Sequence, residues 1–183
     1  MSSPEAHRPG FLVVRAGDDG TYVGGLMVTD VSGLPVDFRY TDPVTPTRLQ
    51  RALYGAVLDR YLRSEVVLRT LLDALEGPPS LLLVDDADLL GEAIDGFPVA
   101  LVAPSKAEPI GPVGAQSAEG AGTFLLQADP SGHPLRVSLP AGSPHEAAVA
   151  GALVALSARM DVLEPVARVQ DALDVIVAGE AAA

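Results

Sequence analysis

Three aspartates follow a short apolar run in this sequence: Asp85, Asp86 and Asp88 come directly after Leu-Leu-Leu-Val at residues 81–84. Proteins of the α/β class often place their sites at the carboxyl ends of such strands. Carboxylates packed within ~5 Å of one another repel, so they need a divalent cation or a raised pKa. Mg²⁺ requires only one or two carboxylates together with water. The pattern therefore offers a candidate metal site.

A structural interpretation competes with the metal site, and we favour it. Asp86 is well placed to cap a following helix, and Asp88 would lie favourably near the positive N-terminus of that helix. The metal interpretation would gain support if Asp30 and Asp37, which lie elsewhere in the sequence, approached the same carboxylates.

Several other kinds of site are excluded by the residues present. A P-loop requires a glycine-rich loop ending in Lys-Ser or Lys-Thr, and the only lysine, Lys106, has no such loop before it. The histidines, His7, His133 and His145, lack the spacing of a zinc motif, and the chain has no cysteine for thiolate sites or disulfides. We expect no cofactor.

A second candidate site combines arginine and tyrosine, the residue types that often anchor binding surfaces. Aromatic residues make up only 4% of the chain, so their gathering near one strand and the helix after it is unusual. The same residues also suit a helix that simply packs on a sheet. The candidate binding residues are Arg39, Tyr40, Gln50, Arg51 and Tyr54.

The formal charge of −12 argues against nucleic acid or an anionic membrane as the main partner, because phosphate contacts come from clustered Lys and Arg. Six of the twelve basic residues nevertheless lie within one stretch, and we expect them to pair with Asp59, Glu65 and Asp73 on a helix. The six basic residues of this stretch are Arg39, Arg48, Arg51, Arg60, Arg63 and Arg69.

No apolar run approaches the ~20 residues of a membrane helix, and the N-terminus lacks a signal-peptide core, so a cytoplasmic location is expected.

The elements that would position these residues follow from hydrophobic periodicity and turn residues. Strands are expected at 11–15, 22–29 and 35–40, followed by one long helix or two that begin at Thr45-Pro46. A parallel strand–helix–strand unit should follow at 81–84, 86–94 and 99–102. After a long loop at 103–122, we expect a hairpin at 123–127 and 135–139 and helices at 143–160 and 161–178.

The expected fold is mixed α/β, with helices packed on a sheet. We expect a flexible segment at 1–10, one domain at 11–178 and a disordered tail at 179–183; lobes at 11–102 and 123–178, joined by the loop 103–122, are the alternative division. The pattern D-x-S-G-x-P occurs at 30–35 and again at 129–134, which indicates either an internal duplication or, as we favour, the same turn chemistry used twice.

The segments at 24–55 and 160–173 resemble an uncharacterised family of bacterial cytosolic proteins. They read GGLMVTDVSGLPVDFRYTDPVTPTRLQRALYG and MDVLEPVARVQDAL. The resemblance implies no activity, cofactor or site residue. It supports 24–55 as one structural unit.

Three functional hypotheses follow. The first is a non-enzymatic cytoplasmic domain that binds a protein partner through the arginine–tyrosine cluster. The alternative is a divalent-metal-dependent hydrolase, of the nuclease or phosphatase type, that uses Asp85, Asp86, Asp88 and, in one variant, Asp30. The third is a structural subunit of a homo-oligomer.

Overall fold

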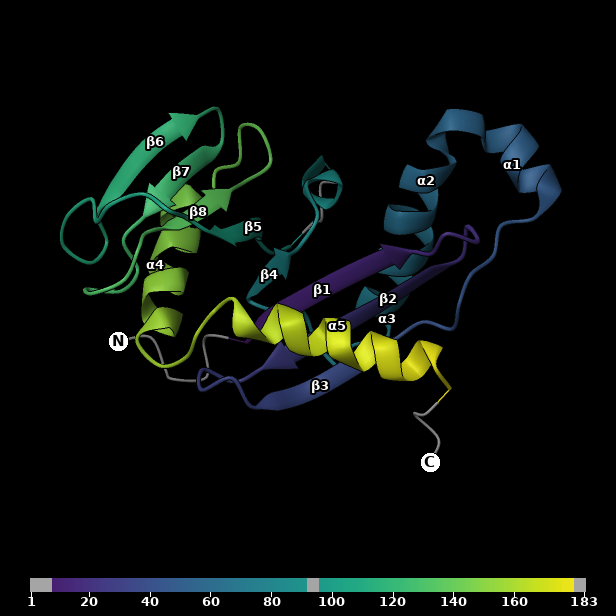
Figure 1. Cartoon of the computed structure of the whole chain (residues 1–183), viewed down its shortest axis with the longest axis horizontal. Coiled ribbons are helices and arrows are strands. Elements are labelled where there is room, and N and C mark those ends of the chain that lie inside the picture. Colours follow the sequence, from purple (N-terminus) through teal and green to yellow (C-terminus); the bar gives the residue numbers. More distant parts are fainter. Residues whose placement is uncertain (1–7, 92–95, 180–183) are drawn as a thin grey trace.

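Eight strands form one mixed sheet in the computed structural model, which describes residues 8–91 and 96–179 (Figure 1). The strand order is β3-β2-β1-β4-β5-β8-β7-β6. Strands β1, β2 and β3 form an antiparallel meander, β4 is parallel to both β1 and β5, and the remaining pairs are antiparallel. The bounds are β1 (Pro9–Ala16), β2 (Tyr22–Thr29), β3 (Pro35–Tyr40), β4 (Leu81–Val84), β5 (Val99–Pro104), β6 (Gln116–Gly120), β7 (Thr123–Leu126) and β8 (Leu135–Ser138).

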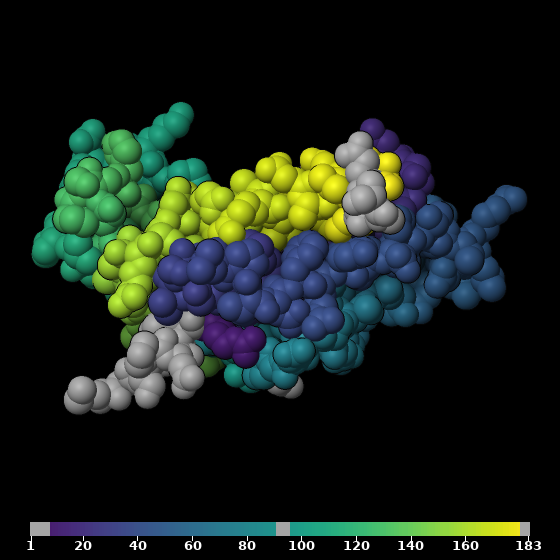
Figure 2. Space-filling view, turned by 90° about the horizontal axis from the view of Figure 1, so that it is seen from below, coloured from purple at the N-terminus to yellow at the C-terminus, as the bar shows by residue number. Residues whose placement is uncertain are grey.

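Helices cover both faces of this sheet. On one face lie α4 (Glu146–Ser157) and α5 (Glu164–Val177), and α5 contacts β1 and β2. The other face is covered by the helical stretch from residue 58 to residue 73. Figure 2 shows α5, in yellow, lying beside the blue segment that contains β3, while the region of α1 extends from one end of the molecule. The predicted mixed α/β fold is confirmed.

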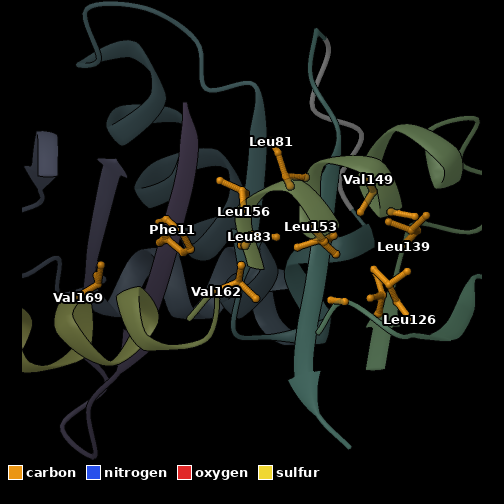
Figure 3. Close-up of a cluster of buried hydrophobic side chains, with 14 of the residues drawn as sticks. Phe11, Leu81, Leu83, Leu126, Leu139, Val149, Leu153, Leu156, Val162 and Val169 are labelled. Carbon is orange, nitrogen blue, oxygen red and sulfur yellow. The ribbon is translucent and has the colours of Figure 1, made fainter. Parts of the chain in front are cut away.

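The buried side chains form two cores, one on each face of the sheet. Alternation along β4 explains the division, because successive side chains of a strand point to opposite faces. Leu81 and Leu83 belong to the core under α4 and α5, part of which Figure 3 shows. Leu82 and Val84 belong to the core under the other helices. The same alternation governs the two aspartates that follow the strand.

The helical stretch after β3 is broken into short pieces. Its first helix begins after Thr47, two residues later than predicted, because Thr47 and Gln50 form a reciprocal capping box. It ends at Gly55, which adopts a φ of 50° and has no atom within 4 Å of where a Cβ would lie. The pieces are α1 (Arg48–Tyr54), a 3-10 turn η2 (Gly55–Val57), α2 (Leu58–Arg60), a π-helical stretch η3 (Tyr61–Leu68) and α3 (Arg69–Asp73).

Two glycines of β2 allow helices to pack closely on both faces of the sheet. A Cβ on Gly24 would lie 2.2 Å from Val67 Cγ1. On Gly25 it would lie 3.0 Å from Val169 Cγ1, on the opposite face. A side chain at either position would push the facing helix away from β2.

The loop predicted at 103–122 contains a strand that the sequence did not reveal. Every residue of β6 is exposed, so the strand has no apolar alternation that could identify it. Backbone pairing with β7 holds it at the edge of the sheet, and Glu119 forms an ion pair with Arg136 of β8 at 2.6 Å. The helix predicted at 86–94 is described only as far as the 3-10 turn η4 (Ala87–Gly91).

Both D-x-S-G turns use the same chemistry. Asp30 Oδ1 accepts hydrogen bonds from the backbone N–H and the hydroxyl of Ser32, at 2.8 and 2.7 Å. Asp129 Oδ1 accepts the equivalent pair from Ser131, both at 2.8 Å. These bonds favour the charged carboxylates and lower the pKa of both aspartates. Within the described residues, no helix is long and apolar enough to span a bilayer.

Candidate functional site at the carboxyl edge of the central strands

The candidate site lies beyond the carboxyl ends of β1 and β4, the parallel pair at the centre of the sheet. From β1 the strand order continues outward to β2 and β3, and from β4 it continues the other way to β5. Open α/β sheets bind ligands outside the carboxyl ends of strands where the order reverses in this way. Leu12 of β1 is paired with Val84 of β4, so Asp85 and Asp86 emerge at this edge.

Asp85 and Asp86 point to opposite faces of the sheet, as the alternation along β4 requires. Asp85 Oδ2 accepts a hydrogen bond from Gln170 Nε2 of α5 at 3.2 Å. Asp86 Oδ2 instead accepts one from Arg63 Nη1 of η3 at 3.1 Å. The two carboxylates that are adjacent in sequence therefore do not converge on one point.

Asp86 also starts the turn that follows β4. Its Oδ1 accepts a hydrogen bond from the backbone N–H of Asp88 at 2.9 Å, and its carbonyl oxygen accepts one from Leu89 N at 3.1 Å. This is the helix-starting role that the structural interpretation of the aspartates predicted. Asp88 lies in the first turn of η4.

Arg63 is the most connected side chain of this edge, and only 15% of it is exposed. Its Nε donates to Asp59 Oδ2 at 3.0 Å, and its Nη1 donates to Asp86 Oδ2 at 3.1 Å and to the carbonyl oxygen of Val14 at 3.3 Å. The guanidinium also lies 6.0 Å from the centre of the Tyr22 ring, whose hydroxyl donates to Asp59 Oδ1 at 2.7 Å. One arginine thus connects β1, α2 and the start of η4.

The sequence indicated only part of this arrangement. It predicted that the arginines of this stretch pair with acids on their own helix, and the i,i+4 pairs Arg63–Asp59 and Arg69–Glu65 are present. The pair between Arg63 and Asp86 was missed, because it joins residues 23 apart through the fold.

A pocket of ≈ 210 Å³ opens between η4 and the helical stretch that carries Arg63. Its lining mixes two arginines, a hydroxyl group and two carboxylates, so the pocket is neither purely basic nor purely acidic. The lining residues are Ala56, Asp59, Arg60, Arg63, Ser64, Asp88 and Leu89.

On the opposite face, Asp85 lies in a neighbourhood that favours its protonated form. Burial raises the pKa of Asp85, and the negative charge of Asp86 raises it further. The hydrogen bond from Gln170 and the charge of Arg15 oppose the rise without cancelling it. Arg15 itself forms an ion pair with Asp174 of α5. A carboxyl group with a raised pKa at a strand end is a candidate for acid–base chemistry.

We expect Asp85→Asn to raise the Tm at neutral pH. The raised pKa means that the native state binds more protons than the unfolded state between the ordinary value of 3.8 and the folded value. Stability is therefore lost as the pH rises through that window, and a neutral amide removes the loss. Thermal melts of the wild type and the variant across acidic and neutral pH test this. A gain that is the same at every pH, or a lower Tm at neutral pH, contradicts it.

The residues present do not fit a divalent metal held by Asp85, Asp86 and Asp88. Across residues 8–91 and 96–179, no group of three or more His, Asp or Glu side chains comes together as metal ligands would. Asp85 faces α5, whereas Asp86 is already paired with the charged Arg63. Asp30 follows the end of β2 that pairs with the start of β1, so it lies at the opposite edge of the sheet.

The arginine–tyrosine cluster is not one surface. Arg39 and Tyr40 lie on the outer strand β3, where Arg39 pairs with Asp37 at 2.8 Å. The other three lie on α1, which is well separated from β3 in Figure 1. There Gln50 caps the helix, Arg51 lies against Gly20, and Tyr54 stacks on Tyr61 with ring centres 4.5 Å apart.

A mixed sheet with helices on both faces, and with a candidate polar site beside its central parallel strands, is the arrangement of an α/β protein. No protein-family model matches the chain, and no curated protein matches it significantly. Solved structures identify the particular fold as that of endonuclease V.

The chain is similar along its whole length to the endonuclease V of Streptomyces avermitilis, with a TM-score of 0.59, 22% identity and 86% of that chain covered. The endonuclease V of Bacillus subtilis gives a TM-score of 0.53 at 14% identity, over 94% of this chain and 80% of that one. A variant of the Ciona intestinalis endonuclease V, in complex with a 23-mer DNA containing an inosine followed by a ribo-adenosine, gives 0.53 at 14% identity, over 89% and 82%. Identities this low establish the fold alone.

These comparisons correct two predictions. The hypothesis of a non-enzymatic domain that binds a protein partner through the arginine–tyrosine cluster is wrong, because the proteins that share this fold are nucleases. The rejection of nucleic acid as a main partner is wrong as well, since one of these proteins is bound to DNA. Net charge is a sum over the whole molecule, so it carries no information about which side chains line one edge of a sheet.

Proposed function

We propose that this chain acts on nucleic acid, which it binds at the carboxyl edge of β1 and β4. The observation that supports this most strongly is the fold, because the likeness to a nuclease extends over the whole chain and 86% of that nuclease. A DNA containing an inosine and a ribo-adenosine is the ligand of another protein with this fold. The cytoplasmic location expected from the sequence agrees with this function.

The composition of the pocket favours a nucleotide over a bare anion. Arg60 can contact phosphate, and such contacts position a nucleic acid without reading its sequence. The carboxylates of Asp59 and Asp88 can accept hydrogen bonds from the N–H groups of a base, as Asp and Glu do in direct readout. The same carboxylates would repel free phosphate.

Binding at the pocket is tested by reversing one charge inside it and one outside it. Arg60→Glu should weaken the binding of a fluorescein-labelled single-stranded 23-mer containing one inosine by about tenfold or more, measured by fluorescence anisotropy. Arg69→Glu is the matched control: it changes the net charge equally, but Arg69 does not line the pocket. Equal losses in the two variants would show non-specific attraction, and no binding by the wild type would refute the proposal.

Cleavage of a phosphodiester is a second candidate function, favoured by Asp85. The raised pKa of its carboxyl group moves toward the range in which general acids and bases work near neutral pH. If the chain cleaves the 23-mer, Asp85→Asn should abolish the product on a denaturing gel and leave the anisotropy titration unchanged. A variant that still cleaves excludes Asp85 from the reaction, and a wild type that binds without cleaving removes this second function alone.

A further inference from the structure

Two carboxylates from separate elements point to one place at the carboxyl edge, and that place is filled by the guanidinium of Arg63. Asp59 belongs to α2 and Asp86 follows β4, yet their Oδ2 atoms lie 3.0 and 3.1 Å from nitrogens of the same arginine. The carbonyl oxygen of Val14, at the carboxyl end of β1, completes a third contact at 3.3 Å.

This set of oxygens is the kind that hard divalent cations take in proteins. Nucleases commonly use such cations to stabilise the attacking and leaving oxygens of a phosphodiester. Here the positive charge is supplied by the guanidinium of Arg63. Its burial to 15% exposure, and its fixation by three partners, give it a defined position at the edge of the pocket.

A metal ion cannot share this position with the guanidinium, because like charges a few ångströms apart repel strongly in a partly buried site. Of the other two aspartates that follow β4, Asp85 faces the other side of the sheet and is bonded to Gln170, and Asp88 lies in the first turn of η4. Among residues 8–91 and 96–179, neither face of the edge therefore offers the converging carboxylates that a divalent metal needs.

We infer that Arg63 is the resident cation of this edge, and that the site engages nucleic acid without a divalent metal. The engagement of nucleic acid without a metal depends on the proposed function. The role of Arg63 as the cation between Asp59 and Asp86 does not, so it can be tested without any nucleic acid.

The test is a melting series in MnCl₂ from zero to 10 mM. The wild type should show no change in Tm. Arg63→Gln leaves Asp59 and Asp86 without their cation, so it should melt lower without metal and gain about 5–10 °C when Mn²⁺ reaches a hundred times its Kd. Arg63→Lys, which keeps the charge, should stay insensitive to Mn²⁺.

A second variant separates specific binding from general stabilisation. Arg63→Gln combined with Asp86→Asn removes one of the two carboxylates and should lose most of the Mn²⁺ response. A rise in Tm of the wild type with Mn²⁺ would overturn the inference directly, and this arm requires no variant to fold. A folded Arg63→Gln variant that ignores Mn²⁺ would also overturn it, because the position would then not be a cation site.

Discussion

Replacing Gln127 with leucine should lower the free energy of unfolding by about 3 kcal/mol, because it removes three hydrogen bonds that contribute about 1 kcal/mol each. Gln127 is fully buried at the end of β7. Its Nε2 donates to the carbonyl oxygens of Asp129 and Gly132 at 2.6 and 2.9 Å, and its Oε1 accepts from Ile110 N at 3.1 Å. Leucine fills a similar volume but leaves all three backbone groups unpaired.

Urea unfolding measures this change, and Gln116→Leu is the control. Gln116 lies on the exposed strand β6, where the same substitution should change stability by no more than about 0.5 kcal/mol. If the two variants lose similar amounts, the side chain of Gln127 does not organise the D-x-S-G turn and the loop at Ile110.

Leu153→Ala should also be strongly destabilising, by about 3–4 kcal/mol, as expected for a large side chain deleted from a packed core. Leu153 of α4 is completely buried in the core that also contains Leu83 of β4 (Figure 3). The substitution leaves a cavity in the core that also holds Leu81 and Leu83 of β4, the strand that precedes Asp85 and Asp86. We therefore expect the loss of stability to be accompanied by looser packing around that strand.

The identical substitution on the surface provides the comparison for Leu153. Leu53 of α1 is 72% exposed, so Leu53→Ala should cost less than about 0.5 kcal/mol. Chemical denaturation of the two variants under the same conditions gives the difference. A cost below about 1 kcal/mol for Leu153→Ala would mean that this core is not packed to normal density.

Much of the fold could be predicted because its signals are local. The strands of the meander and β4 are apolar runs bounded by turn residues, and α5 carries a regular apolar stripe that starts at Pro165. Where the local signal is weak, prediction failed. The edge strand β6 has only exposed residues, and its sequence indicates a loop. The sequence also predicts the helix cap at Thr45 instead of Thr47, because both threonines precede a helix-like pattern.

The candidate site was only partly predictable, because its geometry depends on contacts between distant segments. The position of Asp85 and Asp86 after a buried strand is visible in the sequence. Once β4 is recognised as a strand, the alternation of its side chains places the two aspartates on opposite faces of the sheet. The role of Arg63 could not be found in this way, since its partners Val14 and Asp86 lie 49 and 23 residues away.

The central claim is that Arg63 takes the place of a metal ion at a nucleic-acid site, and one measurement tests it most directly. The Kd of the wild type for the inosine-containing 23-mer is determined by fluorescence anisotropy in EDTA and again in MgCl₂, at equal ionic strength because phosphate contacts are sensitive to salt. We predict Kd values that agree within about twofold. Binding that appears only with Mg²⁺, or that tightens about tenfold or more, would contradict the claim.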